Sequence, residues 1–255
     1  VQLFLVQMSN KVLVEICCGS AEDAIEAWHG GADRVELCSA LFLGGLTPSL
    51  GSLLELKAQA EIKVAAIIRP RQGGFCYSES DFRAAMHDAE QMLKHGADAL
   101  VFGFLHADGR VDLARTRAMV ELAGDVPVCF HRAIDVVPDW REAFDGLMEI
   151  GVQRVLSSGQ ASSAYEGRYV LREMMDYAAG RLQVMPGGGI RAGNVHKLLA
   201  VTGAREIHLG GVSRLMHDSS TQHNPELRFG DPKSPPESEY KRVSRDAVAE
   251  FIASL

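Results

Sequence analysis

The 255-residue sequence has no excess of positive charge. It contains 26 Lys and Arg against 33 Asp and Glu, for a net charge of −7. A protein that holds nucleic acid through its phosphates needs a basic patch or stripe, so we expect no nucleic-acid partner. The sequence also lacks the run of about 20 apolar residues that a transmembrane helix requires. We therefore expect no membrane association.

Cysteine is scarce as well. Five cysteines in a chain of this length do not make a disulfide framework, and an odd number leaves at least one thiol free. There is no Cys-x-x-Cys and no His-x-x-x-His spacing that would indicate a metal site on its own. We expect free thiols and a reducing, cytoplasmic environment.

The first eight residues are apolar but lack the basic start and the small-residue cleavage site of a signal peptide. Met8 is a natural starting point for the chain. We therefore expect residues 1–10 to be an N-terminal extension and residues 11–255 to form one domain.

Short apolar runs alternate with amphipathic stretches along most of this domain. Eight strands, each followed by a helix, predict a single (β/α)₈ TIM barrel of the α/β class in which the first strand pairs with the last. The expected strands are 12–18, 34–39, 63–69, 99–104, 126–132, 154–158, 182–186 and 205–210. The expected helices are 21–29, 50–60, 79–95, 113–123, 139–150, 164–179, 194–202 and 243–254.

A short repeat supports this arrangement. Segments beginning at Gly31, Gly96, Gly151 and Gly203 each join a helix end to a strand, and glycine suits the left-handed position there. Ordinary turns explain any one copy. Four copies before every second strand favour a barrel over a doubly wound sheet.

One segment breaks the alternation. Residues 218–240 are rich in Ser, Pro and charge and follow the eighth strand, on the face where barrel active sites lie. We expect either a lid or a disordered loop, ordered by Leu227, Phe229 and Tyr240 where it packs across the barrel mouth or against a partner subunit.

Two strands carry a Glu and a Cys two positions apart: Glu15 with Cys17, and Glu36 with Cys38. Side chains alternate along a strand, so each pair shares one face. A charged Glu is costly against an apolar helix layer, and we therefore expect both pairs to face the barrel interior. If the strands are neighbours, the two thiols meet at one mouth, with neither in a disulfide.

Other strand ends also carry chemistry. The remaining polar candidates are Arg69, Arg71, His131, Arg132, Asp135, Ser157, Ser158 and His208, with glycine turns at Gly187, Gly188, Gly189, Gly210 and Gly211. One interpretation is a polar active site, in which the glycine loops and arginines bind an anion. It predicts that Glu15, Glu36, Arg69, His131 and Arg132 converge on one solvent-reachable cavity. The others are a salt-bridge layer that only stabilises the barrel and glycine turns without a ligand.

The thiols allow two interpretations as well. Cys17 and Cys38 could bind a soft monovalent ion such as Cu(I), or could be small buried hydrophobes. We interpret Cys76 and Cys129 in the second way, and we expect Cys18 to face the helices.

A series of ordered motifs runs from roughly residue 11 to the C-terminus. They are Val14-Glu15-Ile16-Cys17, Gly31-Ala32-Asp33-Arg34-Val35-Glu36-Leu37-Cys38, Gly44-Gly45-Leu46-Thr47-Pro48-Ser49, Ile68-Arg69-Pro70-Arg71, Phe75-Cys76-Tyr77-Ser78, Phe130-His131-Arg132-Ala133, Val155-Leu156-Ser157-Ser158-Gly159, Pro186-Gly187-Gly188-Gly189-Ile190 and Ser238-Glu239-Tyr240. With these motifs the sequence resembles the CutC family, named for a role in copper homeostasis.

The resemblance implies a TIM barrel, a cytoplasmic location, a homo-oligomer (dimer or tetramer) and, as in some members, Cu(I) on Cys17 and Cys38. Two segments depart from the family pattern. Leu209-Gly210-Gly211 stands where Ser-Ser or Ser-Ala is common, and the segment 227–230 lacks the usual Asn.

Two functions follow. The first is copper homeostasis through the thiol pair. The alternative is a metal-independent lyase or isomerase acting on a small anionic substrate, with or without a phosphate, with Glu15 or Glu36 as base and His131 as acid. Its anion would be held by Arg69, Arg71, Arg132, Gly188, Gly189, His208, Gly210 and Gly211.

Overall fold

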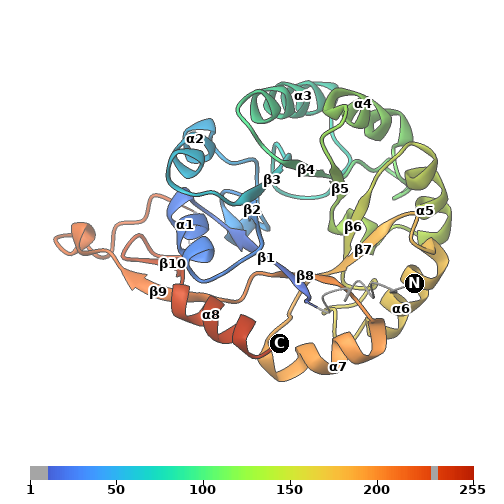
Figure 1. Ribbon diagram of the computed structural model, residues 1–255. Helices are drawn as coiled ribbons and strands as arrows, with labels where there is room; N and C mark the ends of the chain where they lie inside the picture. Colours follow the sequence, from blue (N-terminus) through green and yellow to red (C-terminus); the bar gives the residue numbers. More distant parts are fainter. Residues whose placement is uncertain (1–10, 231–234) are drawn as a thin grey trace, which may run out of the picture.

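The structure, a computed structural model, describes residues 11–230 and 235–255 (Figure 1). The predicted extension 1–10 lies outside the described residues. The barrel consists of β1 (Leu13–Cys18), α1 (Ala21–His29), β2 (Arg34–Leu37), α2 (Leu50–Gln59), β3 (Lys63–Ile67), α3 (Glu79–Lys94), β4 (Ala99–Phe102), α4 (Leu113–Ala123), β5 (Val128–Phe130), α5 (Trp140–Glu149), β6 (Arg154–Ser157), α6 (Arg168–Ala178), β7 (Gln183–Pro186), α7 (Ala192–Thr202), β8 (Glu206–Leu209) and α8 (Arg245–Ala253). Short 3₁₀ turns lie at η1 (Leu41–Leu43), η2 (Arg132–Val136) and η3 (Ser219–Thr221).

The eight strands form one parallel sheet in the order β7-β6-β5-β4-β3-β2-β1-β8. β1 pairs with β8 as predicted, with Glu15 opposite His208. A bridge between Gly187 and His208 joins β7 to β8 and closes the ring seen in Figure 1. The predicted TIM barrel is confirmed.

Strand alternation divides the buried side chains into two groups. One face of each strand packs against the helices, as with Val14, Ile16 and Cys18 on β1. The opposite face fills the barrel, where an apolar group consists of Cys38, Ala65, Ile67, Ala99, Val101, Cys129, Leu156 and Met185. Most of this apolar group lies on β3 to β7. The part of the interior lined by β8, β1 and β2 is filled mainly by polar side chains.

The segment after β8 differs from the prediction. It is flanked by two strands, β9 (Ser213–His217) and β10 (Glu239–Val243), that pair antiparallel as a two-stranded ribbon. The ribbon projects from the side of the barrel beside α1 and α8 (Figure 1). Leu227, Phe229 and Tyr240 are 49%, 79% and 46% exposed, so they do not anchor the segment across the mouth within one chain.

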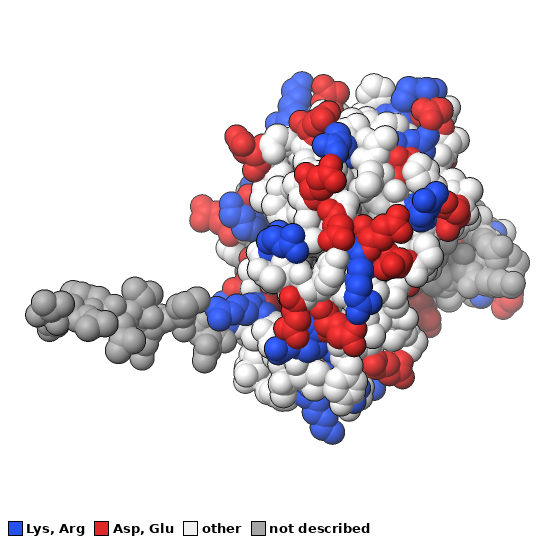
Figure 2. Space-filling model, turned by 90° about the vertical axis from the view of Figure 1, so that its right-hand side faces the viewer, with Lys and Arg blue, Asp and Glu red and all other residues white. Residues whose placement is uncertain are grey.

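Acidic and basic side chains are mixed on the outer surface. On the face shown in Figure 2, Lys and Arg of the described residues lie beside Asp and Glu and form no continuous basic stripe. Within residues 11–230 and 235–255, none of the helices combines the length and the apolar character needed to cross a membrane.

Candidate functional site

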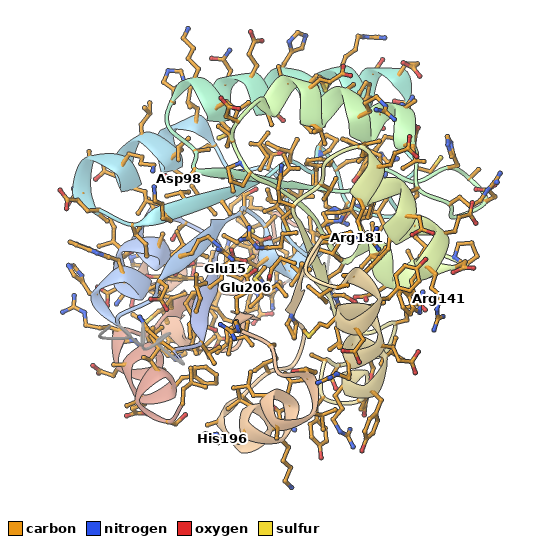
Figure 3. The ribbon with its side chains drawn as sticks, turned by 45° about the vertical axis from the view of Figure 1, so that its right-hand side comes forward. Glu15, Asp98, Arg141, Arg181, His196 and Glu206 are labelled. Carbon is orange, nitrogen blue, oxygen red and sulfur yellow. The ribbon has the colours of Figure 1, made fainter. Side chains whose placement is uncertain are left out.

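The polar half of the barrel interior is built by β8, β1 and β2. Alternation turns Glu15 and Cys17 of β1 to the same side as Glu206 and His208 of β8. On β2, the same rule turns Arg34 and Glu36 inward, followed by Cys38. Figure 3 shows Glu15 and Glu206 inside the barrel, whereas Arg141 and His196 lie on the outer helices. Both Glu-Cys pairs face the barrel interior, as predicted.

The deepest part of this half is a network of buried ion pairs. Arg34 contacts Glu15 through Nε and donates from Nη2 to Glu206 at 2.8 Å. Arg154 of β6 donates to the other oxygen of Glu206, also at 2.8 Å. We did not predict Arg34, Arg154 or Glu206 as site residues. The alternation of polar and apolar residues in Arg34-Val35-Glu36-Leu37-Cys38 and Glu206-Ile207-His208 could have placed Arg34 and Glu206 in the barrel interior.

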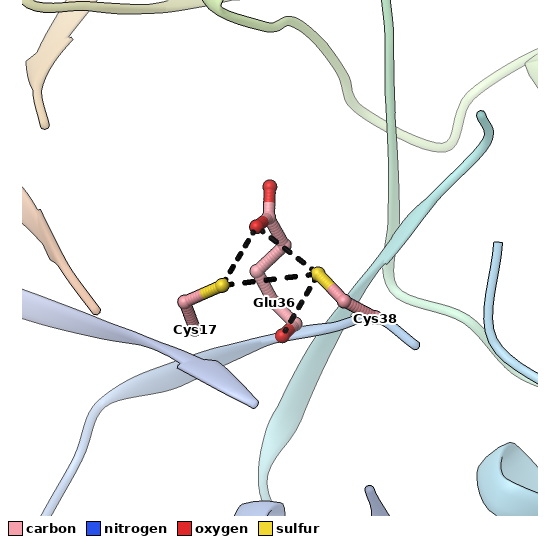
Figure 4. A group of neighbouring side chains, drawn as sticks. All are labelled: Cys17, Glu36 and Cys38. Atoms are coloured by element: carbon pink, nitrogen blue, oxygen red, sulfur yellow. Dashed lines mark hydrogen bonds between the residues drawn. The ribbon is translucent and has the colours of Figure 1, made fainter. Parts of the chain in front are cut away.

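Above this network the two thiols meet. The Sγ atoms of Cys17 and Cys38 are 3.8 Å apart, and both cysteines are free thiols. Oε2 of Glu36 lies between them, 3.4 Å from Cys17 Sγ and 3.3 Å from Cys38 Sγ (Figure 4). Cys38 is buried, while Cys17 is partly exposed. The ligand atoms of these three residues all lie within 4.8 Å of one another, which is compact enough to hold one metal ion.

The environment gives the two thiols opposite properties. A hydrogen bond from the Cys38 thiol, with further support from His208 and Glu36, lowers the pKa of Cys17 to about 5 despite its burial. The same hydrogen bond, together with burial, raises the pKa of Cys38 well above its ordinary value. At neutral pH Cys17 is thus a thiolate, and the Cys38 S–H donates to it.

Burial raises the pKa of Glu36 to about 8, an effect that His208 only partly offsets. Glu36 is therefore protonated at neutral pH. In Glu15, by contrast, the contacts with His208 and Arg34 outweigh burial and lower the pKa to about 2. A carboxylate held so firmly ionised is a weak base, which disfavours Glu15 as a general base.

His208 connects the two carboxylates. Its Nδ1 lies 2.7 Å from Glu15 Oε1, and its Nε2 lies 3.8 Å from Glu36 Oε2. Burial alone would lower the pKa of His208, but Glu36, Cys17 and Glu15 raise it well above its ordinary value. We predicted His208 as an anion ligand, and its described partners are instead these acidic groups.

The residues predicted to converge with Glu15 and Glu36 separate into two further places. Arg69 donates to the carbonyls of Leu43, Gly45 and Gly73. The ring of His131 lies against Phe75. Arg69 and His131 thus lie on the side of the mouth above β3 to β5, and the convergence of all five residues on one cavity stays a prediction.

Arg132 lies elsewhere. β5 ends at Phe130, two residues before the predicted end at residue 132, so His131 caps η2 and Arg132 begins it. Arg132 is 44% exposed, pairs with Asp135 at 2.8 Å, and donates to Ser158 Oγ at 2.7 Å. Asp135 accepts from the backbone N–H groups of Ser158 and Gln160, so a carboxylate of the chain already uses these donors.

The other residues predicted to bind an anion, Arg71 and the glycines after β7 and β8, lie in different surroundings. Arg71 donates to three carbonyls of its own loop and to Asp81, which leaves its predicted anion role without support. Gly188 and Gly189 take positive φ angles, and Gly210 and Gly211 are exposed. A phosphate site at these glycine loops stays a prediction.

Cys18 is buried among the residues that face the helices, as expected. Cys129 is buried in the apolar half of the interior, where burial raises its pKa. Cys76 is exposed.

Comparison with known proteins identifies the family of the chain. A model of the CutC family matches residues 12–213, the span that contains the whole barrel sheet and both thiols. The chain belongs to the CutC family. A CutC family protein of Treponema denticola is 43% identical over 96% of this chain and 100% of its own length. A human relative, a copper homeostasis protein cutC homolog, is 43% identical over 78% of this chain and 73% of its own length.

A solved CutC structure shares the fold. A crystal structure described as copper homeostasis protein CutC from Streptococcus agalactiae has a TM-score of 0.73 and 31% identity, over 77% of this chain and 97% of that one. A phosphoribosylanthranilate isomerase from Thermotoga maritima, with a TM-score of 0.55 and 13% identity over 95% of this chain and 97% of that one, shares the barrel alone.

Proposed function

We propose that this CutC protein binds Cu(I) as its cargo through Cys17 and Cys38. The observation that carries the proposal is the 3.8 Å separation of their sulfurs at the mouth. With metal–sulfur bonds of about 2.3 Å, as in zinc thiolate sites, two sulfurs on one ion lie up to about 4.6 Å apart. The pair therefore matches a single shared ion, and two thiolates are the ligands that Cu(I) selects.

The charge of the site favours a monovalent ion. Its ionised groups balance: Glu15, Glu206 and the Cys17 thiolate are negative, and Arg34, Arg154 and His208 are positive. Replacing the Cys38 proton by Cu(I) leaves that balance unchanged. A divalent ion would have to displace the Glu36 proton as well, or leave an extra buried charge, which is costly.

The test is a competition titration against a Cu(I) chelator with the reduced protein. We expect the native chain to take Cu(I) with a stoichiometry of one, and the Cys17→Ser, Cys38→Ser double variant to take none. Cys76→Ser is the matched control, because it removes an exposed thiol and should leave the affinity unchanged. Equal Cu(I) affinity in the double variant and the native chain would refute the site.

Proton release offers a second prediction. Because Cys17 is already a thiolate and Cys38 is not, Cu(I) binding near pH 7 should release about one proton per ion. The apparent affinity should then rise about tenfold per pH unit between pH 6 and 7.5. Calorimetry in buffers of different ionisation enthalpy measures this number directly.

Glu36→Gln serves as the control for the proton count, because the amide keeps the shape of the side chain and removes its titration. The count should stay at about one. A release of two protons from the native chain, reduced to one in this variant, would show that Glu36 ionises on binding and becomes a third ligand.

The free thiols also indicate where the protein is located. We propose a cytoplasmic location, since five free thiols survive in a reducing compartment.

We also propose self-association through the β9–β10 ribbon and the segment that connects its strands. Leu215, Leu227 and Phe229 expose 52%, 49% and 79% of their surface there, and exposed apolar groups of this kind are typical of protein interfaces.

A further inference from the structure

Arg69 is a buried cation without a carboxylate partner. It follows β3, is 6% exposed, and its terminal nitrogens donate only to the backbone carbonyls of Leu43, Gly45 and Gly73. The other arginines of the mouth, Arg34, Arg71 and Arg132, pair with acids. In the described part of the chain no ion pair includes Arg69. A buried charge left unpaired is expensive, so an anion bound beside Arg69 would be stabilised.

Two more hydrogen-bond donors without partners lie in the same region. The Arg69 Nε–H, the Tyr77 O–H and the His131 Nε2–H are buried and have no acceptor among the described residues, while the Tyr77 oxygen lies beside the Arg69 guanidinium. Tyr77 and His131 are each 5% exposed. The positive charge of Arg69 reaches both: it adds to the burial that lowers the pKa of His131 to about 3, and opposes the burial that raises the pKa of Tyr77. Arg69 and His131 contact the same Phe75 ring, and Tyr77 lies within hydrogen-bonding reach of Arg69, so the three groups are near neighbours.

The tautomer of His131 is set by its backbone contact. Its Nδ1 accepts from the Ala133 N–H at 3.2 Å, so the single proton of the neutral ring lies on Nε2. The ring is held in place by close packing, since a Cβ at Gly103 would come within 2.5 Å of it. His131 thus presents a fixed N–H donor.

Phe75 covers this group. Its ring centroid lies 4.8 Å from that of His131 and 5.5 Å from Arg69 Cζ. It is carried by the loop between β3 and α3, in which Gln72, Gly73, Gly74 and Cys76 are exposed. Gly73 has φ +89°, and a Cβ at Gly74 would touch nothing. Arg69 and Arg71 hold the carbonyls of this loop, so opening the group requires rotation of the Phe75 side chain rather than movement of the loop backbone.

We propose that Arg69, Tyr77 and His131 form a binding site for a small carboxylate, which Phe75 closes. The site offers three N–H or O–H donors, and its one net positive charge matches a monoanion. A phosphate dianion would leave one negative charge unbalanced. Two oxygens of a carboxylate can share these donors, and hydrogen bonds to a charged group are the strong ones.

The site adjoins the thiol pair but does not depend on copper. The Gly45 carbonyl accepts from Arg69, and a Cβ on the same residue would lie 3.4 Å from Cys38 Sγ. One loop residue thus separates the two sites, and a carboxylate bound here would lie at the same barrel mouth as the thiols.

The experiment titrates acetate, lactate and benzoate into the copper-free full chain, with inorganic phosphate for comparison. The Arg69 Nε and His131 Nε2 N–H signals in ¹⁵N-resolved NMR report occupancy. We expect saturable carboxylate binding that moves both signals, and weaker binding of phosphate. A bridging water alone would leave the signals unmoved at every carboxylate concentration, and would overturn the proposal.

Tyr77→Phe separates binding from folding. It removes a hydroxyl whose proton has no acceptor among the described residues and whose oxygen contacts Arg69, so the unliganded Tm should change little. The carboxylate affinity should fall about tenfold or more. Tyr240→Phe on the exposed ribbon is the matched control and should change neither quantity. Unchanged affinity in Tyr77→Phe would contradict the site.

Phe75→Ala tests the closing side chain. Without the ring, the donors are open, and we expect carboxylates to bind faster than to the native chain. If neither the native chain nor this variant binds a carboxylate, or if phosphate binds both as tightly, the assignment to a carboxylate is refuted.

Discussion

Arg34→Met is expected to lower the free energy of unfolding by about 3–5 kcal/mol. Arg34 lies between Glu15 and Glu206 in the barrel interior, with all three side chains less than a tenth exposed. The variant leaves both carboxylates buried, one supported only by His208 and the other only by Arg154. Removing one partner of a buried ion pair is costly because the remaining charge has lost its compensation.

Urea unfolding at pH 7 measures the effect. Arg172→Ala is the matched control, since Arg172 pairs with Asp176 one turn away on the exposed face of α6. A surface pair of this kind contributes less than about 1 kcal/mol. A loss below about 1 kcal/mol in Arg34→Met would mean that water reaches the interior and stabilises the two carboxylates.

The sequence predicts the fold and the thiol pair for one common reason. A strand repeats every two residues, so Glu15 and Cys17 must share a face, and so must Glu36 and Cys38. Parallel neighbours then align their ends, and the register sets Cys17 opposite Glu36. The same rule assigns Arg34 and Glu206 to the interior. We did not apply it to them because they lie at the starts of strands, away from the mouth.

The placement of Arg69 and His131 depends on loops and could not be predicted in this way. Arg69 is held by carbonyls of two separate loops, and their conformations are not encoded in a repeating pattern. The ribbon strands β9 and β10 escaped prediction for a related reason. Apart from Val243, their residues are exposed or only partly buried, so no alternation of apolar and polar residues marks them.

The two buried histidines of the mouth have pKa values shifted in opposite directions. His208 is surrounded by Glu15, Glu36 and the Cys17 thiolate, and its pKa is raised well above its ordinary value. His131 lies in the apolar half, and burial together with Arg69 lowers its pKa to about 3. Folding therefore binds a proton at one histidine and expels one from the other.

The pKa shifts of Cys17 and Glu36 together add no net pH dependence to the free energy of unfolding between about pH 5 and 8. In the folded chain the proton is on Glu36 and Cys17 is ionised, with pKa values of about 8 and about 5. In the unfolded chain the proton is on the thiol and the carboxyl is ionised. The number of protons bound by the pair is the same in both states, so their shifts cancel.

Stability should accordingly reach a maximum near pH 6.5, the ordinary histidine pKa. Above it, the unfolded chain has lost the His208 proton that the folded chain keeps, so the free energy of unfolding falls by up to about 1.4 kcal/mol per pH unit. Below it, the His131 side chain of the unfolded chain gains a proton that the buried ring does not bind in the folded chain, and stability falls at a similar rate.

Urea unfolding at pH 5, 6.5 and 8 tests both limbs of this profile. His208→Gln should flatten the alkaline limb, and His131→Asn the acid limb, because Asn also accepts the Ala133 N–H. Native stability that still increases from pH 6.5 to 8 would mean that His208 is neutral in the folded protein and that the charge balance around Cys17 is different.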